Sequence, residues 1–226
     1  MGFLLSTSKN NANFVFLVSY SSPNNSYMDL FFSNSLPVSR SEKEKRLNQK
    51  ARAIWMTGLS GSGKSTLGLG LEKELSNRGF LVQLLDGDLV RTGINNNLSF
   101  SVQDRQENIR RIAEVSKLFI QCGIITIDCF ISPTNDIRAL ARDIIGKDDF
   151  IEVYMNASIE SCELRDAKGL YAKARRGEIR DFTGIGSPFE PPEHPDLELN
   201  SSELTVEKTI ETALYFILPK IQISER

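Results

Sequence analysis

A phosphate-binding pattern, G-x-x-x-x-G-K-[ST], is matched at every fixed position by Gly58-Leu59-Ser60-Gly61-Ser62-Gly63-Lys64-Ser65-Thr66. The apolar run at residues 53–57 before it predicts a buried strand, and three leucines spaced four apart after it predict a helix. Glycines let backbone N–H groups turn inward around a phosphate, and the start of a helix adds the positive end of its dipole. The stretch therefore predicts a nucleotide-phosphate site, in which Lys64 reaches the β- and γ-phosphates and Ser65 holds Mg²⁺.

The rest of the chain alternates apolar strand patterns with amphipathic helix patterns, which favours an α/β fold with a parallel sheet covered by helices on both faces. Residues 168–195 form a long stretch rich in Gly, Pro and charge, and long loops of this kind are usually binding loops. Further strands are expected at 80–85, 124–130, 150–155 and 196–199, and helices at 41–50, 101–121, 136–145, 160–166 and 205–218.

Composition excludes several classes of protein. Lys and Arg number 27 against 29 Asp and Glu, so the charge balance does not favour a general nucleic-acid or membrane binder. No apolar run approaches the roughly 20 residues of a membrane span. Three cysteines without a C-x-x-C pair indicate reduced thiols and a cytoplasmic protein, and the single histidine, His194, makes a histidine-based metal site or triad improbable.

Residues 1–40 differ from the rest because they are rich in Ser and Asn and contain one acidic residue, Asp29. Their low acidity is typical of an organelle transit peptide, but such peptides are Arg-rich and only Arg40 qualifies here. We expect a disordered extension, or a start placed upstream of a true start at Met28. The folded domain is expected at residues 41–226.

Further motifs follow the phosphate loop along the chain. They are Leu85-Asp86-Gly87-Asp88 with Val90-Arg91, Phe100-Ser101 with Asp104-Arg105 and residues 107–111, Phe130-Ile131-Ser132-Pro133, residues 150–153, Arg165-Asp166 with residues 168–175, and residues 177–179 with 182–185. In this order, over roughly residues 41–221, the set resembles the adenylyl-sulfate kinase family. The resemblance implies a single-domain P-loop kinase fold, ATP and Mg²⁺ as cofactors, and a homodimer. It also implies transfer of the ATP γ-phosphate to the 3′-hydroxyl of adenosine 5′-phosphosulfate (APS), which gives 3′-phosphoadenosine 5′-phosphosulfate (PAPS).

The resemblance also implies roles for particular residues. Lys64 and Asp86 are the expected catalytic residues, and Asp86 shares the metal with Ser65. Ser132 matches a position given in the family as a phosphoserine intermediate, although direct in-line transfer needs none. The acceptor is expected to contact Asp88, Arg91, Phe100, Arg105, Asn108, Ile131, Ser132, Lys168, Gly169, Leu170, Phe182 and Thr183.

Physical chemistry fits several of these roles. Arg91 and Arg105 suit an anionic acceptor because a guanidinium binds such groups in two places. Phe100 and Phe182 are expected to sandwich the acceptor adenine, whereas the pattern alone would place both in the core. Asp88 is the second choice, after Asp86, for the acid or base at the metal site, and its alternative role is to cap the helix that follows.

Some positions leave alternatives open. Asp128 ends an apolar strand, as a Walker-B metal ligand does, and is equally compatible with a plain polar strand end. Four positions depart from the family pattern and affect the expected acceptor affinity: Leu89, Thr92, Thr134 and Asn135. Two rival functions also remain: a small P-loop kinase acting on another nucleotide or a sugar, and a non-catalytic nucleotide-binding module, which would be expected to lose Lys64, Ser65 or Asp86.

Overall fold

The structure is a computed structural model in which residues 38–166 and 168–223 are described. The extension expected over residues 1–40 lies almost wholly outside this part of the chain. The first helix, α1 (Arg40–Leu47), begins at the last residue of that expected extension. Arg40 pairs there with Glu44 and with Asp149, and it donates to the Ala51 carbonyl, so it belongs to the folded unit.

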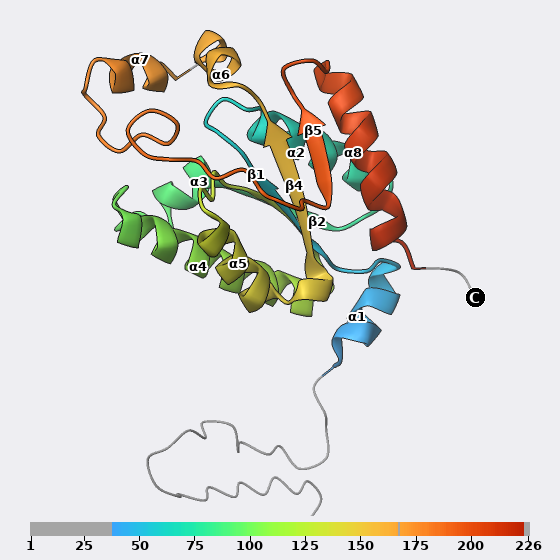
Figure 1. Cartoon of the computed structure of the whole chain (residues 1–226). Coiled ribbons are helices and arrows are strands. Elements are labelled where there is room, and N and C mark those ends of the chain that lie inside the picture. Colours follow the sequence, from blue (N-terminus) through green and yellow to red (C-terminus); the bar gives the residue numbers. More distant parts are fainter. Residues whose placement is uncertain (1–37, 167, 224–226) are drawn as a thin grey trace, which may run out of the picture. The chain divides into compact units, whose positions relative to one another are not determined.

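Five parallel strands form the central sheet, in the order β2-β3-β1-β4-β5 (Figure 1). This confirms the predicted α/β class. The strands are β1 (Ala53–Thr57), β2 (Val82–Asp86), β3 (Ile125–Cys129), β4 (Phe150–Asn156) and β5 (Leu197–Asn200).

Helices cover both faces of this sheet (Figure 1). One layer contains α2 (Lys64–Asn77) and α8 (Val206–Ile221), which contact each other, and the other contains α4 (Val102–Gln121) and α5 (Asn135–Ile145), which also contact each other. Two shorter helices follow strands at their carboxyl ends: α3 (Gly87–Thr92) after β2 and α6 (Ile159–Arg165) after β4. The short helix α7 (Leu170–Arg175) comes after α6, and the 3-10 helix η1 (Lys147–Asp149) precedes β4.

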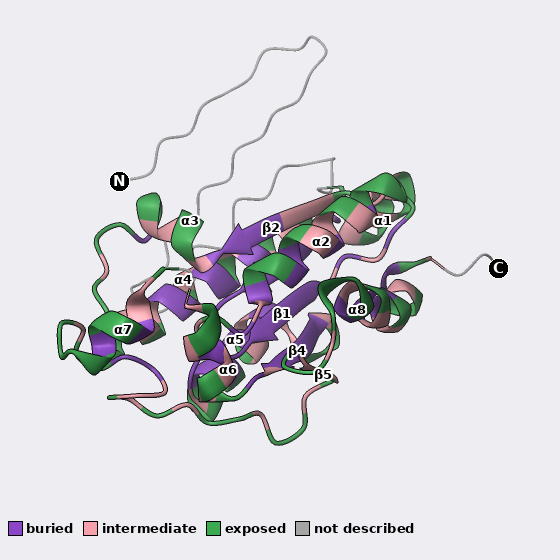
Figure 2. Ribbon diagram, turned by 90° about the horizontal axis from the view of Figure 1, so that it is seen from above, coloured by how far each residue is buried: buried purple, intermediate pink, exposed green. Residues whose placement is uncertain are grey.

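Alternating side chains of β1 divide the core into two layers. Ile54 and Met56 pack with α2 and α8, whereas Ala53 and Trp55 pack with α4 and α5. Because successive residues of a strand point to opposite faces, one five-residue strand contributes to both cores. Figure 2 shows the buried strands between helices whose outer faces are exposed.

Several expectations about local structure change. The helices expected at 41–50 and 205–218 lie at Arg40–Leu47 and Val206–Ile221. The second strand begins at Val82 rather than at residue 80. The segment 168–195, expected to be irregular throughout, contains the helix α7. The cap of α3 is Asp86, which accepts from the Asp88 backbone N–H at 2.9 Å, so Asp88 does not have the capping role considered for it. Ser101 caps α4, because its hydroxyl accepts from the Asp104 backbone N–H at 3.1 Å. Within residues 38–166 and 168–223, no helix is both long and apolar enough to cross a membrane.

Candidate active site

The phosphate loop connects the end of β1 to the start of α2. Gly58 has φ 145°, and a Cβ there would lie 2.6 Å from the Met155 carbonyl oxygen, so β4 passes too close for any side chain. Gly63 has φ 95°, in the region that favours glycine, directly before the first helical residue, Lys64. The loop therefore adopts the backbone that its glycines predict, with the N-terminus of α2 at its end.

Lys64 is buried at the start of α2. Its ammonium donates to the carbonyl oxygens of Gly58 and Leu59, at 2.8 and 2.7 Å. Burial lowers the pKa of Lys64 to about 8. The ammonium is therefore fixed between loop carbonyls and lies at the wall of the adjoining cavity.

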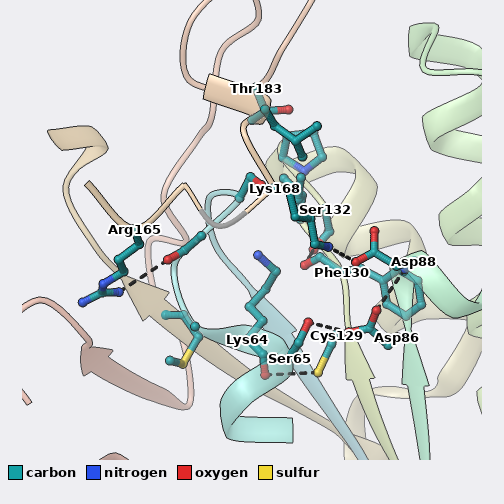
Figure 3. A pocket seen from close by; sticks show the side chains of 18 of the residues that line it. Lys64, Ser65, Asp86, Asp88, Cys129, Phe130, Ser132, Arg165, Lys168 and Thr183 are labelled. Carbon is teal, nitrogen blue, oxygen red and sulfur yellow. Dashed lines mark hydrogen bonds and ion pairs between the residues drawn. The ribbon is translucent and has the colours of Figure 1, made fainter. Parts of the chain in front are cut away.

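Ser65 and Asp86 lie side by side next to Lys64 (Figure 3). The Ser65 hydroxyl donates to Asp86 Oδ2 at 2.5 Å, while Oδ1 of the same carboxylate caps α3. Two oxygen ligands held together in this way fit Mg²⁺, which binds through one or two protein oxygens and keeps water and phosphate as its other ligands. In the part of the chain that the structure describes, no group of three or more His, Cys, Asp and Glu residues could hold a metal by itself.

A cavity of about 1020 Å³ lies over the carboxyl ends of the strands, where open parallel sheets bind ligands. It joins most of the predicted site. The predicted residues that line it are Ser60, Gly61, Gly63, Lys64, Ser65, Thr66, Asp86, Asp88, Arg91, Phe100, Arg105, Asn108, Ile131, Ser132, Lys168, Leu170, Phe182 and Thr183. Gly58, Leu59, Ser62 and Gly169 are not among the residues lining the cavity.

Arg105 ties together two segments of the cavity wall. It donates to the Phe100 carbonyl at 2.8 Å, to the Asp181 carbonyl at 2.5 Å and to the Thr183 hydroxyl at 2.6 Å. Arg91 lies over the Phe100 ring, 4.2 Å from its centroid. Burial lowers the pKa of both guanidiniums. Because the ordinary pKa of arginine is very high, both groups stay charged and can bind an anion.

Asn108 is positioned by a second amide that the sequence did not single out. Asn95 is fully buried, and its Nδ2 donates to Asn108 Oδ1 at 3.0 Å. Because this bond uses the Asn108 oxygen, its amide N–H groups remain for the cavity.

Phe100 and Phe182 both line the cavity, but their surroundings differ. Phe100 is 62% exposed, whereas Phe182 is 9% exposed and forms a T-shaped pair with the Tyr171 ring. Phe182 is therefore partly a core residue, as the pattern alone suggested, and Phe100 is not. At the cavity mouth, Lys168 forms an ion pair with Asp88.

Ser132 and Asp128 are both buried and hydrogen-bonded to neighbouring residues. Ser132 is 2% exposed, with its Oγ accepting from the Trp55 indole N–H at 3.2 Å and its carbonyl accepting from Arg138 at 2.8 Å. The Asp128 carboxylate accepts from Ser116 and Thr126, and burial raises its pKa to about 7. Asp128 does not line the cavity, so the structure gives it a place in the core and not at a metal.

Part of the cavity was missed at the sequence level. Beside the phosphate loop it is lined by Arg165, Ser201, Leu204, Val206 and Thr209. Arg165 donates to the Ser201 carbonyl, and Ser201 donates to the Ser62 carbonyl at 2.8 Å, so this wall is fixed to the loop. The only sequence signal here was the Arg165-Asp166 pair, since the other four belong to a loop and the start of α8.

A phosphate loop at the switch point of a parallel sheet, with a buried lysine and a Ser–Asp pair, defines a P-loop kinase. Comparisons with known proteins identify the family. Residues 50–200 match the family model described as adenylylsulphate kinase. An adenylyl-sulfate kinase from Bacteroides thetaiotaomicron is 60% identical over 185 residues, which are 82% of this chain and 92% of the relative. The chain belongs to the adenylylsulphate kinase family.

Solved structures of the same kind agree with this assignment. The Mycobacterium tuberculosis APS kinase CysC, in complex with AMPPNP and APS, has a TM-score of 0.72 and 42% identity. The match covers 75% of this chain and 98% of that one. A hexameric APS kinase from Thiobacillus denitrificans has a TM-score of 0.59 and 26% identity, covering 80% of this chain and 32% of that one.

Proposed function

We propose that the protein transfers the γ-phosphate of ATP to the 3′-hydroxyl of APS, giving PAPS and ADP and so activating sulfate for assimilation. One observation carries this proposal beyond family membership. A single cavity contains both the Lys64–Ser65–Asp86 group and the wall formed by Phe100, Arg105 and Thr183. Phosphoryl transfer depends mostly on positioning and charge neutralisation, and one cavity brings donor and acceptor together for both.

On the donor side, the phosphates of ATP lie in the loop of residues 58–66. The Lys64 ammonium moves from the Gly58 and Leu59 carbonyls to the β- and γ-phosphates and steadies the charge on the transferred group. The ATP base lies against the wall that Arg165 and Leu204 form on the other side of the loop.

Ser65 and Asp86 would hold Mg²⁺ through their adjacent oxygens. The ion would supply positive charge to the phosphoryl oxygens. Asp86 also faces the space in which the acceptor hydroxyl reacts, where a carboxylate can accept its proton.

On the acceptor side, charge and stacking share the binding. Arg91, Arg105 and Asn108 offer N–H donors to the phosphosulfate and ribose, and Phe100 and Phe182 hold the adenine between them. Asp88, Ile131, Lys168, Leu170 and Thr183 complete this wall. Gly169 does not line the cavity and contributes only as the residue before α7.

In this proposal Ser132 contributes to the cavity wall and does not carry the phosphate as a phosphoserine. Its hydroxyl lies against the Trp55 indole, and in-line transfer from ATP needs no enzyme intermediate. The homodimer expected from the resemblance stays a prediction, and sedimentation at several concentrations measures it directly.

The test is an ADP-release assay that offers APS beside AMP and gluconate as acceptors. The proposal predicts turnover with APS at least about a hundredfold above the other two, because AMP lacks the sulfate that the anion donors would hold and gluconate lacks the adenine. Faster turnover with AMP or gluconate would instead support another small P-loop kinase.

A further inference from the structure

Tyr171, on α7, contacts the phosphate loop and lines the same cavity. Its side chain is 2% exposed, and its hydroxyl donates to the Ser60 carbonyl oxygen at 2.8 Å. Burial raises the pKa of Tyr171 well above its ordinary value, so the hydroxyl stays protonated and donates. The sequence motif of residues 168–175 contains Tyr171 but predicts no role for it.

The position of this bond matters for the loop. A peptide unit is planar, with its carbonyl and the following N–H pointing in opposite directions. A donor that fixes the Ser60 carbonyl therefore directs the Gly61 N–H to the other side. In a phosphate loop, inward-directed N–H groups bind the phosphates. Tyr171 thus fixes the orientation of the Ser60–Gly61 peptide, in the loop where the phosphates of the donor nucleotide are proposed to bind.

The same tyrosine also touches the acceptor wall. Its ring and the Phe182 ring form a T-shaped pair, with the ring centroids 4.9 Å apart and the planes at 78°. Leu59 of the phosphate loop packs in the same small core with Tyr171 and Phe182.

Beyond Phe182 the contacts continue across the cavity. Thr183 accepts a hydrogen bond from Arg105, which also donates to the Phe100 carbonyl. The base of α7 is fixed as well, because the Asp166 carboxylate accepts from the Leu170 N–H at 2.8 Å and from the Ala172 N–H at 3.1 Å. An unbroken series of contacts therefore runs from Ser60 through Tyr171 to the wall on both sides of the acceptor.

We propose that Tyr171 is a positioning residue that couples the donor phosphate loop to the acceptor wall, so that binding of either substrate strengthens binding of the other. The identity of the acceptor rests on the proposed function, whereas the contact with the phosphate loop does not. By linkage, the coupling factor is the same whichever substrate binds first.

The test uses Tyr171→Phe, which keeps the ring against Phe182 and removes only the bond to Ser60. Tyr154→Phe is the matched control: Tyr154 is also a buried tyrosine, its hydroxyl donates to Asn156, and it does not line this cavity. Calorimetry measures the dissociation constant of AMPPNP with and without saturating APS, and melting temperatures are recorded for every variant.

For the wild type and Tyr154→Phe we expect APS to tighten AMPPNP binding at least about fivefold, the low end of typical coupling between sites. For Tyr171→Phe we expect this factor to fall below about twofold, and AMPPNP binding without APS to weaken about tenfold, as loss of one hydrogen bond allows. A purely structural tyrosine would instead lower the melting temperature and leave the coupling factor intact, and that result overturns the proposal.

A second variant keeps the test decisive if Tyr171→Phe folds poorly. Phe182→Leu retains the bond between Tyr171 and Ser60 and removes the edge-on ring contact. Because Phe182 also belongs to the proposed acceptor wall, the APS dissociation constant of this variant is measured first and APS is added well above that value. At this saturation the coupling should be abolished, and retained coupling would contradict the proposal. If the wild type binds AMPPNP but not APS, the proposed function fails. The effect of Tyr171→Phe on AMPPNP alone then still decides whether the tyrosine positions the loop.

Discussion

Replacing Phe100 by alanine separates acceptor binding from folding more cleanly than any other change in the cavity. Its side chain is 62% exposed, so about a third of a phenylalanine's burial energy is lost, roughly 0.5–1 kcal/mol. Loss of the Arg91 contact over the ring adds roughly 0.5–1 kcal/mol. A stability loss of about 1–2 kcal/mol is therefore expected.

The effect on acceptor binding should be larger and selective. Stacking of a base on an aromatic ring contributes about 1–3 kcal/mol, which corresponds to a rise of roughly 5- to 150-fold in the acceptor KM. The KM for ATP should change less than about twofold, because the donor phosphates are proposed to bind at residues 58–66. Phe100→Tyr should be much milder since it retains the ring.

Phe182→Ala is the informative comparison. Phe182 is 9% exposed and packs against Tyr171, so its loss should cost about 3–5 kcal/mol of stability in addition to acceptor affinity. Steady-state kinetics for both substrates and thermal melts of both variants give the answer. The stacking role of Phe100 would be refuted if Phe100→Ala left the acceptor KM unchanged or raised the KM of both substrates equally.

Three further predictions concern charged groups. Lys64→Ala should lower turnover about 100- to 1000-fold without unfolding the protein. Lys73→Ala, at an exposed position of the same helix, should keep the wild-type turnover. Equal turnover of the two variants would contradict the placement of Lys64 at the phosphate site. Asp86→Asn should keep the cap of α3 but raise the Mg²⁺ concentration needed for half-maximal rate at least about tenfold, and an unchanged Mg²⁺ titration would contradict the metal assignment. Burial raises the folded-state pKa of Asp128 to about 7, above its unfolded value. The folded state therefore binds a proton that the unfolded state releases, and the free energy of unfolding falls as pH rises from about 4 to about 7. The loss is up to about 1.4 kcal/mol per pH unit. Asp128→Asn should therefore gain melting temperature relative to the wild type as pH rises from 5 to 7, and a difference independent of pH would count against this reasoning.

The sequence predicted the central features of the fold because they depend on local chemistry. The phosphate loop, β1 and α2 follow from glycine spacing and from apolar periodicity within 25 residues of chain. Elements whose ends depend on distant residues were predicted less well. The second strand starts late because the Leu81 N–H is taken by the side chain of Gln49, a contact that no local pattern contains. The helix α7 was missed because the Asp166 side chain, and not an apolar stripe, fixes its first turn.

In the site, too, features that depend on local sequence were predicted and features that depend on distant residues were not. The residues of the phosphate loop and the Ser65–Asp86 contact follow from motif and strand position, whereas the wall containing Arg165 and Thr209 requires the folded chain to bring it together. The unequal burial of Phe100 and Phe182 likewise depends on Tyr171, which lies 11 positions before Phe182 in a segment without periodicity.

The position of the transferred phosphate tests the central claim most directly. ATP labelled with ³²P in its γ-phosphate is incubated with the protein, Mg²⁺ and APS, and the labelled product is digested with a 3′-nucleotidase. The account predicts that the label enters a product with the mass of PAPS and that the 3′-nucleotidase releases all of it as inorganic phosphate. Label that resists this enzyme, or that appears only as inorganic phosphate before digestion, would show that the acceptor atom is not the 3′-hydroxyl of APS and would contradict the account.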